Sequence, residues 1–363
     1  MRYYSIDILR TVAIFVMVIV HFGENLSGLN SWFAGFGAPL FAMLSGASYR
    51  LWVNGQARLG VDDEHVSKIS IRRGLFVIGV GFAFNILVWL PEDTFNWDVL
   101  TFIGTALLIL NVMRRTTTPI IALVAGISLL ISPLLRRMAN YDAYWVNGYF
   151  DGDLVLSDLA IGFLATGYFP VFPWIAYSLT GFAAAGWFFP EHENATAESN
   201  SPWPPVLLGA ILAAVSGGLL LAKTPIQEHS LRWLFGGWTM FPPTIEYLLA
   251  TLGLGLMLWG ILHRLVDRKR EPQRLHGLFE IAKTFSRYSF TIYVLHHVVH
   301  LWPLWIFAMV SGQEATSYWM KAMSSAYSVP LAFTFLALCY GILRWLGPER
   351  QYGLESVMRW LCD

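Results

Sequence analysis

The segment SIDILRTVAIFVMVIVHF (residues 5–22) decides the fold, because it is long and apolar yet carries ionisable side chains. Arg10 and His21 are eleven positions apart. At about 100° per residue they share one face of a helix, and at about 1.5 Å per residue they are roughly 16 Å apart along its axis. The segment predicts a membrane-spanning helix with a cation near one bilayer surface and an imidazole near the other.

Two interpretations of this pair stay open. Ionisable groups inside a membrane span are costly, and they usually mark a pathway or a reaction centre. In the plainer interpretation, Arg10 snorkels to the surface and His21 lies at the level of the lipid headgroups. Asp7 precedes Arg10 by three positions, near enough on a helix to pair with it and to lower the cost of placing a cation near lipid.

The composition extends this prediction to the whole chain. Of the 363 residues, 56% are hydrophobic, only 13% are charged, and 16 are Trp, which is typical of an integral membrane protein embedded in a lipid bilayer. The formal net charge is zero, so no nucleic-acid partner is expected. Cys339 and Cys362 have no metal-ligand spacing. The first span lacks a signal-peptide cleavage site, so we expect it to be retained.

Apolar segments of about the length of a bilayer crossing predict an all-α polytopic bundle of about ten spans that forms one domain, 1–363. The predicted spans are 8–22, 32–52, 74–91, 98–113, 118–135, 170–189, 204–222, 242–263, 285–308 and 328–346. Asp158 and two glycines interrupt the apolar stretch 155–169, which we expect to be interfacial or re-entrant. The tail 347–363 is predicted to contain a short amphipathic cytoplasmic helix.

The distribution of Lys and Arg predicts the orientation of the chain. With the N-terminus in the cytoplasm, all but five of the 24 basic residues lie on the inner side. The five exceptions are Arg136, Arg137, Lys223, Arg232 and Lys321. Both termini are therefore predicted to be cytoplasmic, with Arg10 near the inner surface and His21 near the outer surface. This topology places the loop 190–203 on the cytoplasmic side, although that loop is acidic and the other cytoplasmic segments are basic.

Three histidines occur late in the span 285–308. His296 and His300 are four positions apart and share a helix face, whereas His297 is expected to point elsewhere. A metal or haem is one interpretation, but zinc needs three or four ligands and no further ligand cluster follows, so no metal is predicted. The alternative is a polar lining hydrogen-bonded between helices. We expect His296 to line a cavity, with His297 and His300 at the interface.

Further polar and aromatic residues lie at the predicted outer ends of spans. Glu246 falls about one turn into the span 242–263. The run GYFPVFPWIAY (167–177) offers the stacking faces of Tyr168, Trp174 and Tyr177. Such groups suit a substrate-binding mouth, and an aromatic belt at the membrane interface is the alternative.

A cluster of arginines flanks the cytoplasmic ends of the spans between 32 and 135. Guanidinium groups bind phosphate through two parallel hydrogen bonds, so this cluster predicts a docking surface for a phosphorylated donor. Topology alone also explains it. The sequence has no glycine-rich phosphate loop, so ATP and NAD are not expected. The cluster contains Arg50, Arg72, Arg73, Arg114 and Arg115.

Five segments, in order, resemble the bacterial heparan-α-glucosaminide N-acetyltransferase-like family of membrane acyltransferases. The resemblance implies transfer of an acetyl group from cytoplasmic acetyl-CoA to an amino sugar, or to a hydroxyl of a glycan, on the far side of the membrane. The segments are SIDILRTVAIFVMVIVH (5–21), DVLTFIGTALLIL (98–110), the run at 167–186, MFPPTIEYLLATLG (240–253) and RYSFTIYVLH (287–296).

The resemblance also implies a set of catalytic residues, which are Asp7, Arg10, His21, Asp98 and His296. The chain departs from the family pattern in two places. Thr11 stands where a glycine usually follows the arginine. The stretch 24–32 has no histidine, whereas the lysosomal animal enzyme has one in its first lumenal loop. The identity of the acceptor therefore stays open.

Two roles for His21 and one rival function remain. His21 is a general base that deprotonates the acceptor, or it carries the acyl group itself. The rival function is a transporter or flippase for a sugar or a lipid-linked intermediate. Such proteins often show broken half-helices at matched positions in two halves, and no matched pair is found here. A homodimer is compatible with either function.

Overall fold

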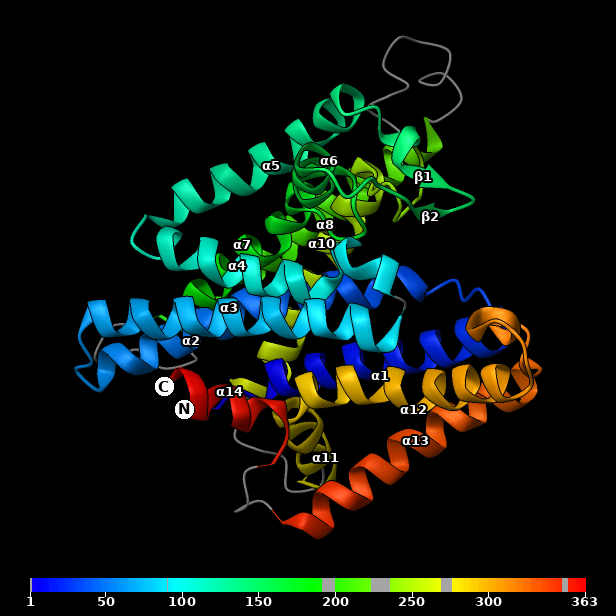
Figure 1. Ribbon diagram of the computed structural model, residues 1–363. Helices are drawn as coiled ribbons and strands as arrows, with labels where there is room; N and C mark the ends of the chain where they lie inside the picture. The colour runs from blue at the N-terminus through cyan, green and yellow to red at the C-terminus, as the bar shows by residue number, and fades with distance from the viewer. Residues whose placement is uncertain (1, 90, 191–199, 223–235, 269–275, 348–351) are drawn as a thin grey trace. The chain divides into compact units, whose positions relative to one another are not determined.

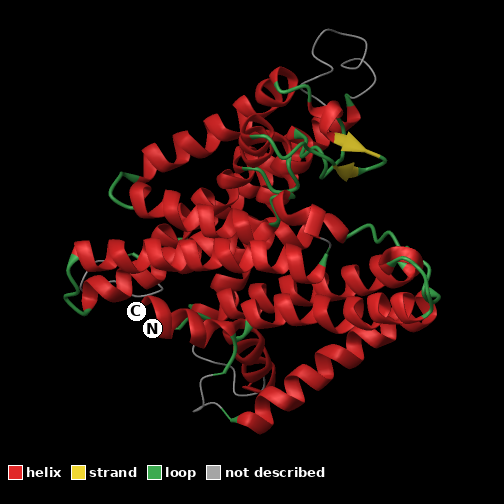
Figure 2. Cartoon of the chain, in the orientation of Figure 1, coloured by secondary structure: helices red, strands yellow, loops and turns green. Residues whose placement is uncertain are grey.

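Helices make up most of the described chain, as the apolar segments predict (Figure 2). The computed structural model describes residues 2–89, 91–190, 200–222, 236–268, 276–347 and 352–363. The chain divides into two compact units, apart from single residues at its ends. Unit 1 is Pro39–Arg270, and unit 2 combines Arg2–Ala38 with Glu271–Leu361.

Unit 2 is built around the first helix, α1, which packs against α11, α12 and α13 (Figure 1). Phe15 of α1 meets Phe285 edge-on, with ring centroids 5.0 Å apart. α1 ends at Ser27, and Gly28 caps it with a left-handed φ of 66°, which suits glycine. The elements are α1 (Tyr4–Ser27), η1 (Ala34–Phe36), α11 (His276–Arg287), α12 (Ser289–Val310), η7 (Ala315–Tyr318), α13 (Ser325–Leu346) and α14 (Leu354–Cys362).

The predicted amphipathic tail forms α14, which is held to the start of α12. Glu355 accepts hydrogen bonds from the main-chain N–H groups of Phe290 (2.8 Å) and Thr291 (3.1 Å) and from the Thr291 hydroxyl. These N–H groups have no partner within their own helix, so the carboxylate caps α12. The tail residues 348–351 lie outside the described residues.

Unit 1 contains the rest of the described elements, and its helices pack mainly as the pairs α3–α4, α5–α7 and α8–α10. One short antiparallel strand pair is present, with Trp145 opposite Phe150. The elements are α2 (Gly37–Arg58), α3 (Asp63–Val88), η2 (Pro91–Phe95), α4 (Val99–Met113), α5 (Thr118–Met138), η3 (Tyr141–Tyr144), β1 (Trp145–Val146), β2 (Tyr149–Phe150), α6 (Leu156–Ile161), η4 (Gly162–Thr166), α7 (Val171–Phe188), α8 (Trp203–Leu221), α10 (Ile245–Leu262) and η5 (His263–Asp267).

Eight helices in the described ranges are long and apolar enough to cross a membrane, and a bent pair raises the number to nine. The pair joins Leu156–Thr166 to Val171–Phe188 at an angle of 44°, a geometry of a broken span or a re-entrant loop. The polytopic helical bundle is thus confirmed, although the sequence predicted ten spans. The difference lies at 32–52, where α2 is long enough but carries Arg50 and several small polar residues.

Glycines bring α2 and α7 close together inside unit 1. A Cβ added at Gly46 would overlap the carbonyl oxygen of Ser178, and one added at Gly181 would overlap that of Met43. Because the obstructing atoms belong to the backbone, a side chain at either position must push the helices apart. Small residues at such crossings are a common packing device in membrane proteins.

Alanine at Gly181 is therefore expected to destabilise the protein by about 1–3 kcal/mol, the usual cost of overpacking. The melting temperature of the detergent-purified chain measures this effect. Gly79→Ala on α3 is the matched control, because a Cβ there meets nothing within 4 Å. Equal melting temperatures for the two variants would contradict the close crossing.

Candidate functional site

The candidate reaction centre of unit 2 is a group of histidines contributed by α1 and α12. Nδ1 of His21 lies 2.9 Å from Nε2 of His296, and Nδ1 of His296 lies 3.1 Å from the carbonyl oxygen of Ile292. A carbonyl can only accept, so Nδ1 of His296 is the protonated nitrogen of the neutral ring. Nε2 of His296 then accepts from Nδ1 of His21. This order leaves the lone pair of His21 on Nε2.

His300 belongs to a second hydrogen-bond chain, in which both of its ring nitrogens have a partner. Its Nδ1 donates to the carbonyl oxygen of His296 (2.6 Å), and its Nε2 accepts from Nδ2 of Asn25 (2.9 Å). Oδ1 of Asn25 accepts in turn from Nε1 of Trp319 (3.3 Å). Both ring nitrogens of His300 are therefore occupied, and the side chain fixes α12 to α1.

His297 does not point away from the other histidines, so that prediction was wrong. Its side chain is buried, and its ring centroid lies 4.6 Å from that of His21 and 3.9 Å from that of His296. Nδ1 of His297 donates to the carbonyl oxygen of Tyr293 (3.4 Å). The prediction assumed that only residues on the same face of α12 as His296 and His300 would meet α1. The ring of His21 instead contacts two consecutive residues of α12, His296 and His297.

Polar contacts near the start of α1 attach it to α11. Nη1 of Arg10 donates to the carbonyl (3.2 Å) and hydroxyl (2.9 Å) oxygens of Ser286. Asp7 is buried and accepts from Nε of Arg2 at 2.6 Å, a partner that lies before the predicted span. The hydroxyl of Thr11 donates to the carbonyl oxygens of Asp7 (2.8 Å) and Ala282 (3.0 Å). Thr11 thus links these two helices.

The remaining predicted site residues lie in unit 1. Asp98 is buried and caps α4 by accepting the N–H of Leu100 (3.0 Å). Glu246 is almost fully buried in the first turn of α10, where its Oε1 accepts the N–H of Gly237 (3.0 Å). Its Oε2 is buried and accepts no hydrogen bond from the described residues. A buried acceptor of this kind is costly to leave without a donor.

The aromatic residues predicted at the outer mouth are also inside unit 1. Trp174 and Tyr177 are fully buried, and the hydroxyl of Tyr177 lies 2.6 Å from that of Thr251. Tyr168 packs edge-on against Trp145 (5.0 Å) and Phe241 (5.3 Å). Nε1 of Trp174 has no acceptor among the described residues. This burial differs from that of a lipid-facing aromatic belt.

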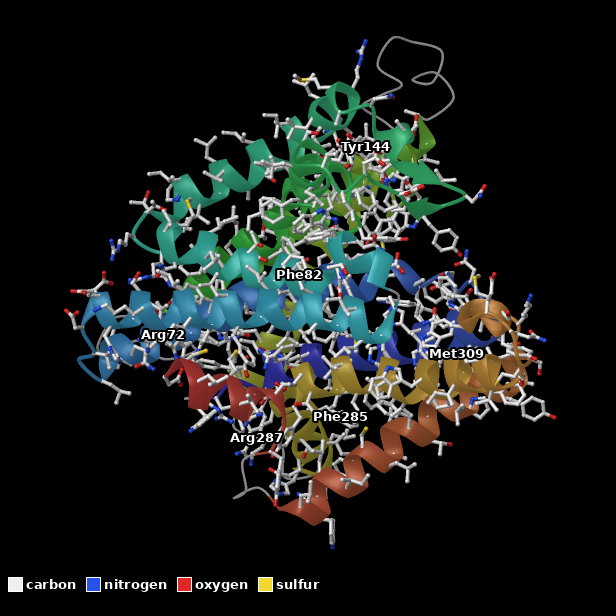
Figure 3. All side chains as sticks on the ribbon, viewed as in Figure 1. Arg72, Phe82, Tyr144, Phe285, Arg287 and Met309 are labelled. Carbon is white, nitrogen blue, oxygen red and sulfur yellow. The ribbon has the colours of Figure 1, made fainter. Side chains whose placement is uncertain are left out.

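The arginines of the predicted donor-binding cluster differ in their surroundings. Arg50 stacks over Phe182 at 4.8 Å and Arg73 over Trp52 at 4.6 Å. Arg72 lies on α3 (Figure 3), where it is exposed. It has no hydrogen-bond or ion-pair partner in the described part of the chain. Two further arginines, Arg114 and Arg115, share the carboxylate of Asp63.

A cavity of about 300 Å³ in unit 1 was not predicted from the sequence. Aromatic and acidic side chains line it, among them Trp97, Tyr149, Asp151 and Asp158. At its edge the hydroxyl of Tyr144 donates to Oδ1 of Asp158 (3.3 Å). Burial, reinforced by the charge of Asp158, raises the pKa of the Tyr144 hydroxyl above its ordinary value.

Sequence reasoning also missed a buried histidine–aspartate pair at the end of α10. Nδ1 of His263 lies 3.1 Å from Oδ2 of Asp267, and both side chains are buried. Nε2 of His263 has no partner among the described residues. The two residues are four positions apart in a π-helical turn, so the spacing of His and Asp was a signal that the sequence offered.

Comparison with known proteins identifies one family. The sequence model described as "Heparan-alpha-glucosaminide N-acetyltransferase, catalytic" matches residues 2–216, which is more than half of the chain. The matched part includes Asp7, Arg10, His21 and Asp98. His296 lies beyond it. No curated protein matches the chain.

Proposed function

Because this chain belongs to the catalytic family of heparan-alpha-glucosaminide N-acetyltransferases, we propose that it moves an acetyl group from cytoplasmic acetyl-CoA to a sugar across the membrane. The acceptor is an amine or a hydroxyl of an extracytoplasmic glycan. The family and the eight candidate spans make the chain an integral membrane acetyltransferase. The bacterial cytoplasmic membrane, with both termini inside, is the location that we propose.

One observation carries the proposed mechanism, namely the hydrogen-bond chain from His21 through His296 to the carbonyl oxygen of Ile292, from which the tautomer of His21 follows. The carbonyl oxygen of Ile292 fixes the proton of His296, and His296 in turn fixes the proton of His21 on Nδ1. Nε2 of His21 accepts no hydrogen bond from the described residues and keeps its lone pair. An imidazole oriented in this way by a second group is suited to general-base catalysis.

The proposed reaction uses that lone pair directly. Nε2 of His21 takes a proton from the acceptor as the acceptor attacks the thioester carbonyl carbon. The tetrahedral intermediate expels CoA as a thiolate, and the proton on Nε2 passes to the thiolate sulfur. CoA leaves as the thiol, and His21 returns to its neutral form. His296 accepts from Nδ1 of His21 and stabilises the transient imidazolium.

The other predicted residues support this reaction in separate roles. Asp7 and Arg10 are positioning residues, because their contacts hold α1 to its own N-terminal segment and to α11. Asp98 is proposed to position α4 through its capping bond. Arg50, Arg72 and Arg73 are proposed to bind the phosphates of the donor.

Purified protein incubated with acetyl-labelled acetyl-CoA, with and without glucosamine, tests the proposed function. We expect the label to appear in the amino sugar, together with one equivalent of free CoA. A chain that moved sugar across a vesicle membrane and transferred no label to any amino sugar or glycan would overturn the proposal in favour of a transporter or flippase.

Tyr168, Trp174, Tyr177 and Glu246 are proposed to bind the acceptor. A sugar amine or hydroxyl can donate to the buried Oε2 of Glu246, and aromatic faces suit the apolar face of a sugar ring. Because a hydrogen bond to a charged group contributes about 1.5–3 kcal/mol, Glu246→Gln is expected to raise the acceptor KM by at least about 10-fold. CoA affinity should not change.

Two further variants check this assignment. Trp174→Phe should also raise the acceptor KM, whereas Trp345→Ala, at a highly exposed position of α13, should not. Initial rates at varied glucosamine concentration give these constants, and thermal melts confirm that each variant is folded. An unaltered acceptor KM in both Glu246→Gln and Trp174→Phe would remove these residues from the acceptor site.

A further inference from the structure

The histidines of unit 2 form a three-nitrogen group that the sequence could not reveal. His21, His296 and His297 each offer one ring nitrogen, and these three atoms all lie within 4.8 Å of one another. The sequence showed only the pair on α12, and the third member comes from α1, which runs beside α12 (Figure 1). We propose that these three histidines bind a divalent transition-metal ion of the zinc type, and that its binding blocks acetyl transfer.

The spacing of the three nitrogens suits such an ion. Zinc–nitrogen bonds of about 2.0–2.1 Å place two ligands of a tetrahedral site roughly 3.4 Å apart. The nitrogens of His21 and His296 are already 2.9 Å apart, and the widest separation must shorten by at most about 1.4 Å. Small side-chain rotations supply shifts of this size. A water molecule or solvent anion would complete the tetrahedron.

The hydrogen bonds of the α12 histidines also suit a metal. A metal-bound histidine usually donates its other ring N–H to a carbonyl or carboxylate, which fixes the ring and leaves the ligating nitrogen bare. His296 donates from Nδ1 to Ile292, and His297 donates from Nδ1 to Tyr293. In both rings Nδ1 therefore faces a backbone carbonyl, and each ring is one of the three that can offer a ligand atom to the ion. Neutral imidazole suits zinc, copper and nickel, and not magnesium or calcium.

His300 provides the contrast inside the same helix. Both of its ring nitrogens are occupied, by the carbonyl oxygen of His296 and by Asn25. Its Nε2 bond is to Asn25, which is not a proposed ligand, whereas the Nε2 bond of His296 is to His21 and is replaced when the ion binds between these two rings. The proposed site is thus limited to three ligands.

Metal binding would remove the base of the proposed reaction, and this half of the inference rests on the proposed function. Nδ1 of His21 must lose its proton to bind the ion, and exchange with water returns a proton to Nε2. The ring stays neutral and no net proton is released. Nε2 then carries hydrogen instead of a lone pair, so it cannot accept a proton from the acceptor.

Titration of the purified, chelator-treated full-length chain with ZnCl₂, followed by calorimetry, tests the binding directly. We expect one ion per chain. His297→Ala is expected to weaken binding by more than about 10-fold, since losing a ligand costs at least as much as losing its outer partner. His276→Ala, at an exposed position of α11, is the matched control and should bind like the unaltered chain. CoCl₂ offers a second probe, because tetrahedral cobalt absorbs visible light strongly.

The acetyl-transfer assay tests the consequence. Zinc should inhibit the unaltered chain and His276→Ala, whereas the rate that His297→Ala shows without zinc should be the same after zinc is added. His297→Gln serves if the alanine variant fails to fold. Absent saturable zinc binding, or binding that His297→Ala and His297→Gln leave unchanged, would overturn the metal site. Zinc binding in a chain without transferase activity would support the site and overturn the proposed function instead.

Discussion

The His21→Ala variant should bind acetyl-CoA normally and transfer its acetyl group about 10²–10⁴-fold more slowly than the unaltered chain. The variant removes the only ring nitrogen in the described His21–His296 hydrogen-bond chain that keeps an unshared lone pair. The residues proposed to bind the donor phosphates are Arg50, Arg72 and Arg73, and the His21→Ala variant keeps all three. Acetyl transfer under saturating donor and calorimetric CoA binding measure the two quantities separately.

The control for this experiment is His276→Ala, which removes an exposed imidazole from α11 and should keep the full rate. A His21→Ala variant that kept more than about a tenth of the rate would be incompatible with a general base. The acyl-carrier alternative is tested on the unaltered chain with labelled acetyl-CoA and no acceptor. Label retained on the His21 peptide after rapid denaturation would identify a covalent intermediate, which the base mechanism does not form.

The helices were predictable because a bilayer fixes the length and polarity of every span. Arg10 and His21 could be assigned to one helix face from their spacing alone, and α1 contains both. His21 and His296 could each be chosen from their position in an apolar span. Their contact could not be predicted, because residue spacing describes one helix and carries no information about which helix lies beside it.

The errors have the same physical origin. His297 was predicted to point elsewhere from angles around the axis of its own helix, but the ring of His21 contacts two adjacent positions. Asp7 was expected to meet Arg10 because the two are three positions apart. The charge of Asp7 does attract that of Arg10. The part that was missed is that its carboxylate accepts hydrogen bonds from Arg2, which lies before the predicted span. Helical spacing relates only residues within one helix, so it could not indicate a partner that lies before the predicted span.

Counting charges also concealed which of them are paired. The arginine cluster was read from five residues of one type, but Arg114 and Arg115 converge on a single carboxylate, that of Asp63. A sequence records this aspartate about fifty positions earlier, on another helix. The structure therefore distinguishes Arg114 and Arg115, which share an ion pair with Asp63, from Arg50 and Arg73, which stack on aromatic rings.

That separation leads to the expected behaviour of Arg72. Arg72 is exposed and has no hydrogen-bond or ion-pair partner among the described residues, and Arg73 next to it stacks over Trp52. Arg72→Ala should weaken CoA binding by about 10-fold or more, because a guanidinium–phosphate contact contributes roughly 1.5–3 kcal/mol. Arg73→Ala should have a similar effect. The loss should shrink at high salt, since exposed charges are screened.

Arg115→Ala is the matched control, because it removes an exposed arginine that is already bound to Asp63. Its CoA affinity should stay close to that of the unaltered chain. Calorimetry with CoA and with dephospho-CoA then locates the contact. If Arg72 or Arg73 meets the 3′-phosphate, its alanine variant loses affinity for CoA and little for dephospho-CoA. If it meets the diphosphate, both ligands weaken equally. If CoA binding is unchanged in both Arg72→Ala and Arg73→Ala, neither arginine binds a phosphate, because removing a guanidinium that binds phosphate must weaken CoA binding. The two arginines would then serve only to set the orientation of the chain in the membrane.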